Sequence, residues 1–168
     1  LFKALEIKNF EFNAQGVELN QRYTSNALIV ESEHEIFEKD EQLYLQATTR
    51  SDAKIPHTWL INSKGHKVST LDITGKGRFT LLTGLSGKGW KQAVEALDLA
   101  YLDVIQIGSR EYRDVYGTWN AKSEIHESGA VLVRPDGYVA WRYQDNTNDA
   151  FDYENTLKAV LKQIQLAV

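Results

Sequence analysis

The stretch FTLLTGLSGKGWKQAVEALDLAYLDVIQIG, residues 79–108, decides the fold. Its first five residues form a continuous apolar run typical of a buried strand, and a glycine-rich turn follows. Trp90, Val94 and Leu97 then recur at i, i+4 and i+7, which predicts a helix. Residues 102–108 are a second apolar, β-branched run. This order predicts a parallel β-α-β unit with a right-handed crossover.

A hairpin follows in GAVLVRPDGYVAWRY, residues 129–143. Its two apolar runs flank Arg134-Pro135-Asp136-Gly137, with proline second and glycine where a positive φ is needed. This sequence predicts a type I turn closed by a G1 bulge. Both faces of AVLV are apolar, so we expect this strand to lie centrally in its sheet.

The rest of the C-terminal half completes the element order. Residues 111–127 predict a short helix and a loop, and Tyr153–Val168 predict a final helix because apolar residues recur at helical spacing. From Phe79 onward the order is β-α-β-α-β-β-α. The predicted fold class is therefore α/β, a thioredoxin-like domain with a mixed sheet and an N-terminal extension.

The N-terminal part carries weaker signals. Residues 1–15 predict a short, weakly amphipathic helix, and Val17–Val30 predict a strand. The acidic ESEHEIFEKDEQ after it predicts a solvated linker to about Gln46. The runs IPHTWL and INSKGHKVSTLDI, residues 55–73, predict a second hairpin that turns at Lys64-Gly65.

The composition predicts one compact domain and excludes several kinds of chemistry. The chain has 168 residues, 42% apolar and 25% charged, with a net charge of -4 and no basic block to bind nucleic acid. It has no cysteine, which excludes disulfides, thiolate catalysis and a redox CxxC motif. No apolar run suits a membrane span and no signal-peptide core is present, so we expect a cytoplasmic chain. Leu1 in place of methionine suggests a piece of a longer protein.

The turn TGLSGKGW, residues 83–90, invites two catalytic interpretations. A P-loop needs four residues between its first glycine and the Gly-Lys pair, but only two follow Gly84. A serine nucleophile elbow around Ser86 needs glycine where Lys88 stands. Nor does any GxGxxG dinucleotide motif occur. We therefore expect a strand-to-helix turn with an exposed lysine.

The histidines predict no metal site. Their spacing matches neither HxxxH nor HExxH; they are His34, His57, His66 and His126. We expect His57 to hydrogen-bond at a strand end. A small enzyme built on His66, Ser69 and Asp72 is a weaker hypothesis, because alternation along the predicted strand would place Ser69 opposite the other two.

The tryptophans and hairpin arginines have ordinary structural interpretations. Four tryptophans are more typical of core anchors than of a ligand platform; they are Trp59, Trp90, Trp119 and Trp141. Arg134 and Arg142 could bind a carboxylate ligand, but solvated or salt-bridged arginines are commoner at hairpin ends. The residues by themselves therefore predict a fold and assign no catalytic, cofactor-binding or metal-binding side chain.

Several stretches together resemble one enzyme family. GVELNQRYTSNALIV, PHTWL, KVSTLDITGKGRFTLLTGLSGKGW and GAVLVRPDGYVAWRY stand in the order and approximate spacing of the C-terminal region of class A FAD-dependent aromatic hydroxylases. The chain is most similar to the phenol 2-monooxygenase and 2,4-dichlorophenol 6-monooxygenase group. The resemblance covers nearly the whole chain.

The resemblance implies where the chemistry lies. In such enzymes NAD(P)H reduces FAD, and oxygen passes through a flavin hydroperoxide to an activated phenol ring. The glycine motifs that hold FAD are absent here, so no FAD is expected on this chain. Residues 1–46 would be the tail of the flavin and substrate region plus a linker, and residues 47–168 the thioredoxin-like domain. LSGKG stands in place of a redox CxxC, and Gly129-Ala130 in place of the expected cis-proline.

Two functional hypotheses follow. The first is a C-terminal, non-catalytic domain, structural or dimer-forming, of an FAD-dependent, NAD(P)H-using phenol or chlorophenol monooxygenase. Its partners would be the enzyme's own FAD and substrate domains, and the fragment alone would be inactive. The alternative is a free-standing thioredoxin-like binding module without redox activity. The substrate pocket would lie outside this chain, so the sequence does not identify the phenol.

Overall fold

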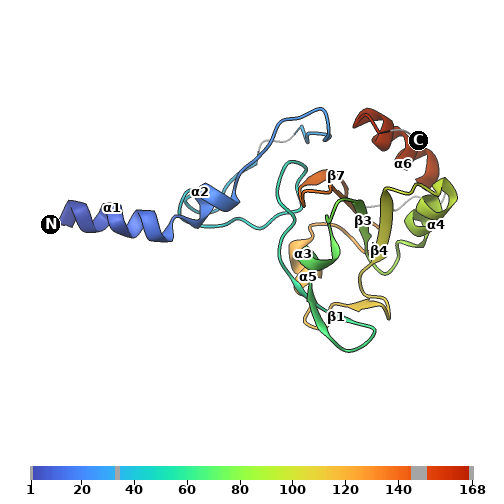
Figure 1. Cartoon of the computed structure of the whole chain (residues 1–168), viewed down its shortest axis with the longest axis horizontal. Helices are drawn as coiled ribbons and strands as arrows, with labels where there is room; N and C mark the ends of the chain where they lie inside the picture. Colours follow the sequence, from blue (N-terminus) through green and yellow to red (C-terminus); the bar gives the residue numbers. More distant parts are fainter. Residues whose placement is uncertain (1, 33–34, 145–150, 167–168) are drawn as a thin grey trace.

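The computed structural model describes residues 2–32, 35–144 and 151–166, and it consists of an extended arm joined to a compact body (Figure 1). We call residues 2–32 and 35–46 the arm, and residues 47–144 and 151–166 the body. The arm holds two helices, α1 (Phe2–Asn13) and α2 (Gln15–Leu19). The body holds β1 (Trp59–Asn62), β2 (Lys67–Ser69), α3 (Thr70–Ile73), β3 (Phe79–Thr83), α4 (Lys88–Leu97), β4 (Leu102–Gln106), β5 (Tyr112–Arg113), α5 (Thr118–Lys122), β6 (Ala130–Val133), β7 (Val139–Tyr143) and α6 (Tyr153–Gln163).

The main sheet confirms the predicted thioredoxin-like arrangement. Its strand order is β4-β3-β6-β7. Strands β3 and β4 pair in parallel, with α4 as the crossover between them, whereas β6 pairs antiparallel with both β3 and β7. The β-α-β unit and the C-terminal hairpin therefore share one mixed sheet.

The predicted turn closes the β6–β7 hairpin. The Gly137 amide donates to the Arg134 carbonyl at 2.9 Å, and the Arg134 amide donates to the Tyr138 carbonyl at 2.7 Å. Gly137 has φ of 84°, in the region that favours glycine, and the strand register shifts between Leu132 and Val133. All four residues of β6 are buried, as expected for a central strand.

Each face of the main sheet carries its own apolar core. On one face α4 and α6 lie together (Figure 1). Their Trp90 and Leu161 belong to the same apolar cluster as Leu132 of β6. On the other face, residues of the smaller sheet and of α5, including Leu60 and Trp119, pack towards the side chains of β3 and β6. The body therefore has a complete core.

The second hairpin forms but is shorter than predicted. Strands β1 and β2 pair antiparallel around the Lys64-Gly65 turn, and β5, which the sequence analysis missed, adds a third strand beside β1. The predicted strand is wrong after Ser69. There Ser69 and Asp72 form a capping box that starts α3: the Ser69 amide donates to Asp72 Oδ2 at 2.8 Å.

The predicted Val17–Val30 strand is wrong. Residues 15–19 are helical and residues 20–30 are irregular. Side-chain hydrogen bonds hold this segment in place of backbone pairing between strands. Asn20 Nδ2 donates to the carbonyls of Glu41 and Tyr44, both at 2.8 Å. The predicted weak helix near the N-terminus is confirmed as α1. The predicted linker to Gln46 has no helix or strand in the residues described there.

The last helix ends earlier than predicted. Gln165 has φ of 64°, and the Leu166 amide donates to the Leu161 carbonyl at 2.9 Å, which closes α6 at Gln163. Residues 167–168 of the predicted helix, and also His34, lie outside the described residues.

Candidate functional site at the junction of arm and body

The site with the most charged side chains joins the arm to the body. Three arginines and four carboxylates from distant parts of the chain meet there; they are Arg22, Arg50, Arg142, Glu31, Glu35, Asp52 and Glu124. We call these seven residues the junction. Most of them are largely shielded from water, so their charges interact more strongly than surface pairs do.

Arg142 on β7 connects both parts of the chain. Its side chain is 7% exposed. Nη2 donates to Glu31 Oε2 of the arm at 2.6 Å, and Nη1 donates to Glu124 Oε2 of the body. Glu124 Oε2 also accepts from the Thr48 hydroxyl at 2.6 Å. A buried guanidinium with two carboxylate partners ties the arm to the β6–β7 hairpin.

A second group of charges surrounds Arg22. Its Nε and Nη2 each donate to Glu35 at 2.7 Å, in a bidentate pair. Asp52 Oδ1 lies 3.6 Å from Arg22 Nε and 4.0 Å from Arg50 Nε. That buried oxygen accepts no hydrogen bond from the part of the chain that the structure describes. Asp52 is therefore held by charge rather than by hydrogen bonds.

The carboxyl groups of Glu35 and Asp52 respond to burial in opposite ways. Burial would raise the pKa of Glu35, but hydrogen bonds from Arg22 and Gln46 and the charges of Arg22 and Arg50 bring its pKa below the usual value. The pKa of Asp52 is raised, chiefly by burial, because the charges of Arg22 and Arg50 offset burial only in part. Glu35 therefore supports the ionised junction, whereas ionised Asp52 is costly.

The NQRY stretch supplies further contacts beside these charges. The backbone amide of Gln46 donates to Asn20 Oδ1 at 2.9 Å. The Tyr23 ring meets the Tyr138 ring edge to face, with 4.7 Å between their centroids. Leu28 is 6% exposed within the core that α4 and α6 cover. The Ile29 amide donates to the Ala140 carbonyl of β7 at 2.8 Å. The arm is thus anchored on the hairpin.

The glycine-rich turn of residues 83–90 is a strand-to-helix connection, as predicted, with Lys88 exposed. Two of its glycines lie where a side chain would not fit. A Cβ on Gly87 would stand 1.8 Å from Thr83 Oγ1, and one on Gly89 would stand 2.4 Å from the Tyr153 ring. These two glycines are therefore required by internal packing, because any side chain there would collide with Thr83 or Tyr153.

The residues of the hypothetical small enzyme are not arranged as a catalytic triad. Asp72 Oδ2 binds the Ser69 amide, and the Ser69 hydroxyl lies 2.7 Å from Nδ1 of His57 rather than beside His66. The prediction that His57 hydrogen-bonds at a strand end is confirmed. Ser69 Oγ also accepts from the Leu71 amide at 3.1 Å, so the serine caps a helix.

Three of the four tryptophans are core anchors, as predicted: Trp90, Trp119 and Trp141 are at most 9% exposed. The prediction is wrong for Trp59, which is 43% exposed and carries Lys67 Nζ 4.2 Å from its ring centroid. Alternation along β1 places Trp59 on the face opposite the buried Leu60. The salt-bridge prediction holds for both hairpin arginines, since Arg134 Nη2 donates to Asp136 at 2.6 Å.

The sequence analysis missed the junction, although one signal pointed to it. Arg142 interrupts the apolar run VAWRY, and a charge in a strand of that kind requires a buried partner. Which acidic residues pair with it was not readable, because Glu31 and Glu124 are far away in sequence. Within the described residues, no cluster of metal-ligating side chains occurs and no helix is both long and apolar enough to cross a membrane.

Comparison with known proteins gives a consistent family. Residues 49–165 match the family described as "Aromatic-ring hydroxylase, C-terminal". A 2,4-dichlorophenol 6-monooxygenase of Cupriavidus pinatubonensis is 41% identical over 155 residues, which cover 89% of this chain and 26% of that protein. A phenol 2-monooxygenase of a Pseudomonas species is 37% identical over 151 residues, or 87% of this chain and 25% of that protein.

The solved structures agree with the sequence matches. The flavin-dependent monooxygenase PieE, in complex with FAD and substrate, superimposes with a TM-score of 0.80 and 44% identity. The match covers 92% of this chain and 27% of PieE. The chain spans about a quarter of the length of the relatives it matches.

Proposed function

Since the chain belongs to the family of aromatic-ring hydroxylase C-terminal domains, we propose that it is the non-catalytic C-terminal domain of an FAD-dependent, NAD(P)H-using phenol or chlorophenol monooxygenase. Its role there is structural. Residues 47–168 form the domain, and residues 1–46 connect it to the enzyme's FAD and substrate domains. Catalytic residues and both cofactors belong to those domains.

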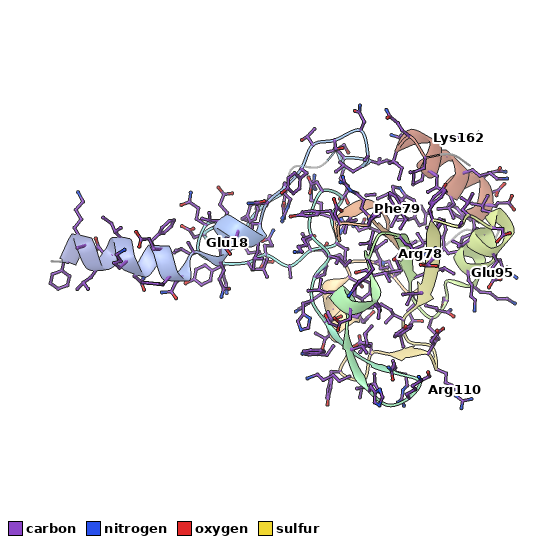
Figure 2. All side chains as sticks on the ribbon, in the orientation of Figure 1. Glu18, Arg78, Phe79, Glu95, Arg110 and Lys162 are labelled. Atoms are coloured by element: carbon purple, nitrogen blue, oxygen red, sulfur yellow. The ribbon has the colours of Figure 1, made fainter. Side chains whose placement is uncertain are left out.

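One observation carries the structural role: α1 has apolar side chains but buries none of its residues. Phe2, Phe12 and Leu5 are 84%, 81% and 58% exposed, and the side chains of α1 project into open space (Figure 2). An isolated helix of about 12 residues is marginal in water. A helix of this kind is stable when other protein surrounds it.

The positions of the apolar residues in α1 indicate that this cover lies on two sides. Leu5 and Phe12 are seven residues apart and share one side, whereas Ile7 and Phe10 share another, about 140–200° around the helix from Leu5. A surface helix has a single apolar stripe, but a helix with apolar residues on opposite sides is enclosed. We infer that α1 inserts between elements of the FAD and substrate domains.

The junction would then transmit the position of the body to that helix. Arg142 pairs with Glu31 of the arm, and Arg22 of the arm lies 3.6 Å from Asp52 of the body, so the segment that follows α2 is anchored at a fixed place on the domain. Because the arm is held by these charges and by the contacts of Tyr23, Leu28 and Ile29, its attachment does not depend on the apolar cover of α1. An arm anchored in this way favours a structural role for the domain over a catalytic one.

The test is the size and colour of the native protein, isolated from its source cells with an antibody raised against residues 47–168. We expect a yellow polypeptide several times longer, which oxidises NAD(P)H when phenols are added. The purified 168-residue chain should be colourless and inactive. A colourless native protein of this length would contradict the proposal and favour a free-standing binding module, and stoichiometric flavin on the 168-residue chain would contradict the placement of FAD.

A further inference from the structure

A small pocket lies between the arm and the body, beside the junction. Its volume is about 160 Å³. Most of its wall is apolar: Leu19, Leu45, Ala47, Ile55, Pro56 and Leu71. An apolar cavity of about 150 Å³ is large enough to bind benzene. The pocket is therefore the size of a single aromatic ring.

The polar groups of the pocket favour an anion. Arg22, Lys54 and His57 line it together with Gln46, and among the described residues no carboxylate does. The charge of Arg22 is already matched by Glu35. Lys54, in contrast, makes no ion pair with the residues that the structure describes. It is exposed, so its ammonium group is available to a ligand.

The hydrogen bonds around His57 leave it a donor. The buried Ser69 hydroxyl oxygen accepts from the Leu71 amide, so its own proton needs an acceptor, and His57 Nδ1 lies 2.7 Å away. A neutral imidazole that accepts at Nδ1 carries its proton on Nε2. Within the described residues Nε2 has no hydrogen-bond partner, so this N–H remains for an anionic oxygen.

Three half-exposed leucines surround the same pocket. Leu19, Leu45 and Leu71 are 40%, 46% and 40% exposed, and they come from α2, the arm's last residues and α3. Apolar surface of this kind is stabilised when a ligand covers it. The pocket thus combines an apolar wall with one cation, Lys54, that has no ion pair among the described residues, and one N–H donor, His57 Nε2.

We propose that this pocket binds a one-ring aromatic carboxylate, with the ring against the leucines and the carboxylate between Lys54 and His57. The inference is independent of the proposed function, because it needs only the residues of this chain.

Benzoate is the probe, titrated into the 168-residue chain while the fluorescence of Trp59 is followed, since that ring meets the His57 ring at 4.7 Å. We expect saturable binding, and binding of neutral phenol at least about tenfold weaker. Lys54→Met should weaken benzoate about tenfold. The matched control is Lys64→Met, an exposed lysine in the β1–β2 turn, which should bind like the unmodified chain.

Ala47→Leu tests the volume of the pocket independently of charge. The added side chain occupies the space of the ring, so benzoate binding should be lost while circular dichroism shows an unchanged fold. Absence of saturable binding to the unmodified chain would overturn the proposal. So would equal affinities for benzoate and phenol, or Lys54→Met and Ala47→Leu variants that both bind as tightly as the control.

Discussion

The arm and the body are stabilised by different forces. The body has a core on each face of its sheet, with Leu81, Leu82, Leu132 and Leu161 fully buried. In the arm, the described residues that are fully buried are Gly16 and Leu28. The arm is attached to the body by arginine–carboxylate pairs, by Leu28 in the core and by Tyr23 against Tyr138. The apolar side chains of α1, in contrast, face outward. A well-folded body and an incompletely covered arm can therefore belong to one chain when a polar junction connects them.

The largest effect should come from the core of the body. Trp90 is fully buried and its ring meets Trp141, Tyr143, Phe151 and Tyr153. Trp90→Ala should lower the free energy of unfolding by about 3–5 kcal/mol, because it leaves a cavity. Urea denaturation measures this loss of unfolding free energy. The control is Phe12→Ala in α1, which should change the value by less than about 0.5 kcal/mol; equal losses would remove the distinction between arm and body.

The junction should give the next largest effect. Arg142→Ala leaves Glu31 without its closest cation in a partly buried place, and we expect a loss of about 2–3 kcal/mol. Arg134→Ala is the matched control on the same hairpin, where a more exposed pair with Asp136 should be worth less than about 1 kcal/mol. Similar losses for the two arginines would mean that the junction does not anchor the arm.

The two acids of the junction should differ in sign. At pH 7, Glu35→Gln should lower the free energy of unfolding by about 1–2 kcal/mol because two charge-assisted hydrogen bonds are lost. Asp52→Asn should not lower it, because the raised pKa of Asp52 shows that burial penalises its charge.

The pH dependence of this pair follows from linkage. The lowered pKa of Glu35 gives stability that is present above its ordinary value of 4.5 and lost as pH falls through the folded-state pKa. The cost of ionised Asp52 is present above its raised pKa and disappears below 3.8. The difference between the two variants should therefore shrink on going from pH 7 to about pH 3. A constant difference would contradict these assignments.

The smallest effect should come from removing residues 1–19. Residues 2–19, which the structure describes, contribute no apolar side chain to either core, so the free energy of unfolding should stay within about 0.5 kcal/mol of the full chain's value. A longer truncation, of residues 1–31, also deletes Leu28 and Glu31. It should clearly lower the free energy of unfolding. If both truncations cost the same, the boundary of the anchored segment lies elsewhere.

The sequence predicted most of the body because its signals are local. The apolar run at 79–83, the helical spacing from Trp90 to Leu97 and the turn at Gly137 each follow from neighbouring residues. The capping box at Ser69 and Asp72 was also readable in principle. The junction was not, because Arg142 pairs with Glu31 across more than a hundred residues and no periodicity encodes that contact. The Val17–Val30 error has the same origin, since polar tertiary contacts there override β propensity.

The most direct test of the arm–body distinction is amide hydrogen exchange, measured on the 168-residue chain and on the native protein isolated with the antibody. We expect the amides of α1 to be unprotected in the chain and protected in the native protein, because the proposed FAD and substrate domains would enclose the helix. Amides of β3 and β6 should be protected equally in both. Equal protection of α1 in the two samples would contradict the account of the arm as a segment completed by the rest of a flavin-dependent hydroxylase.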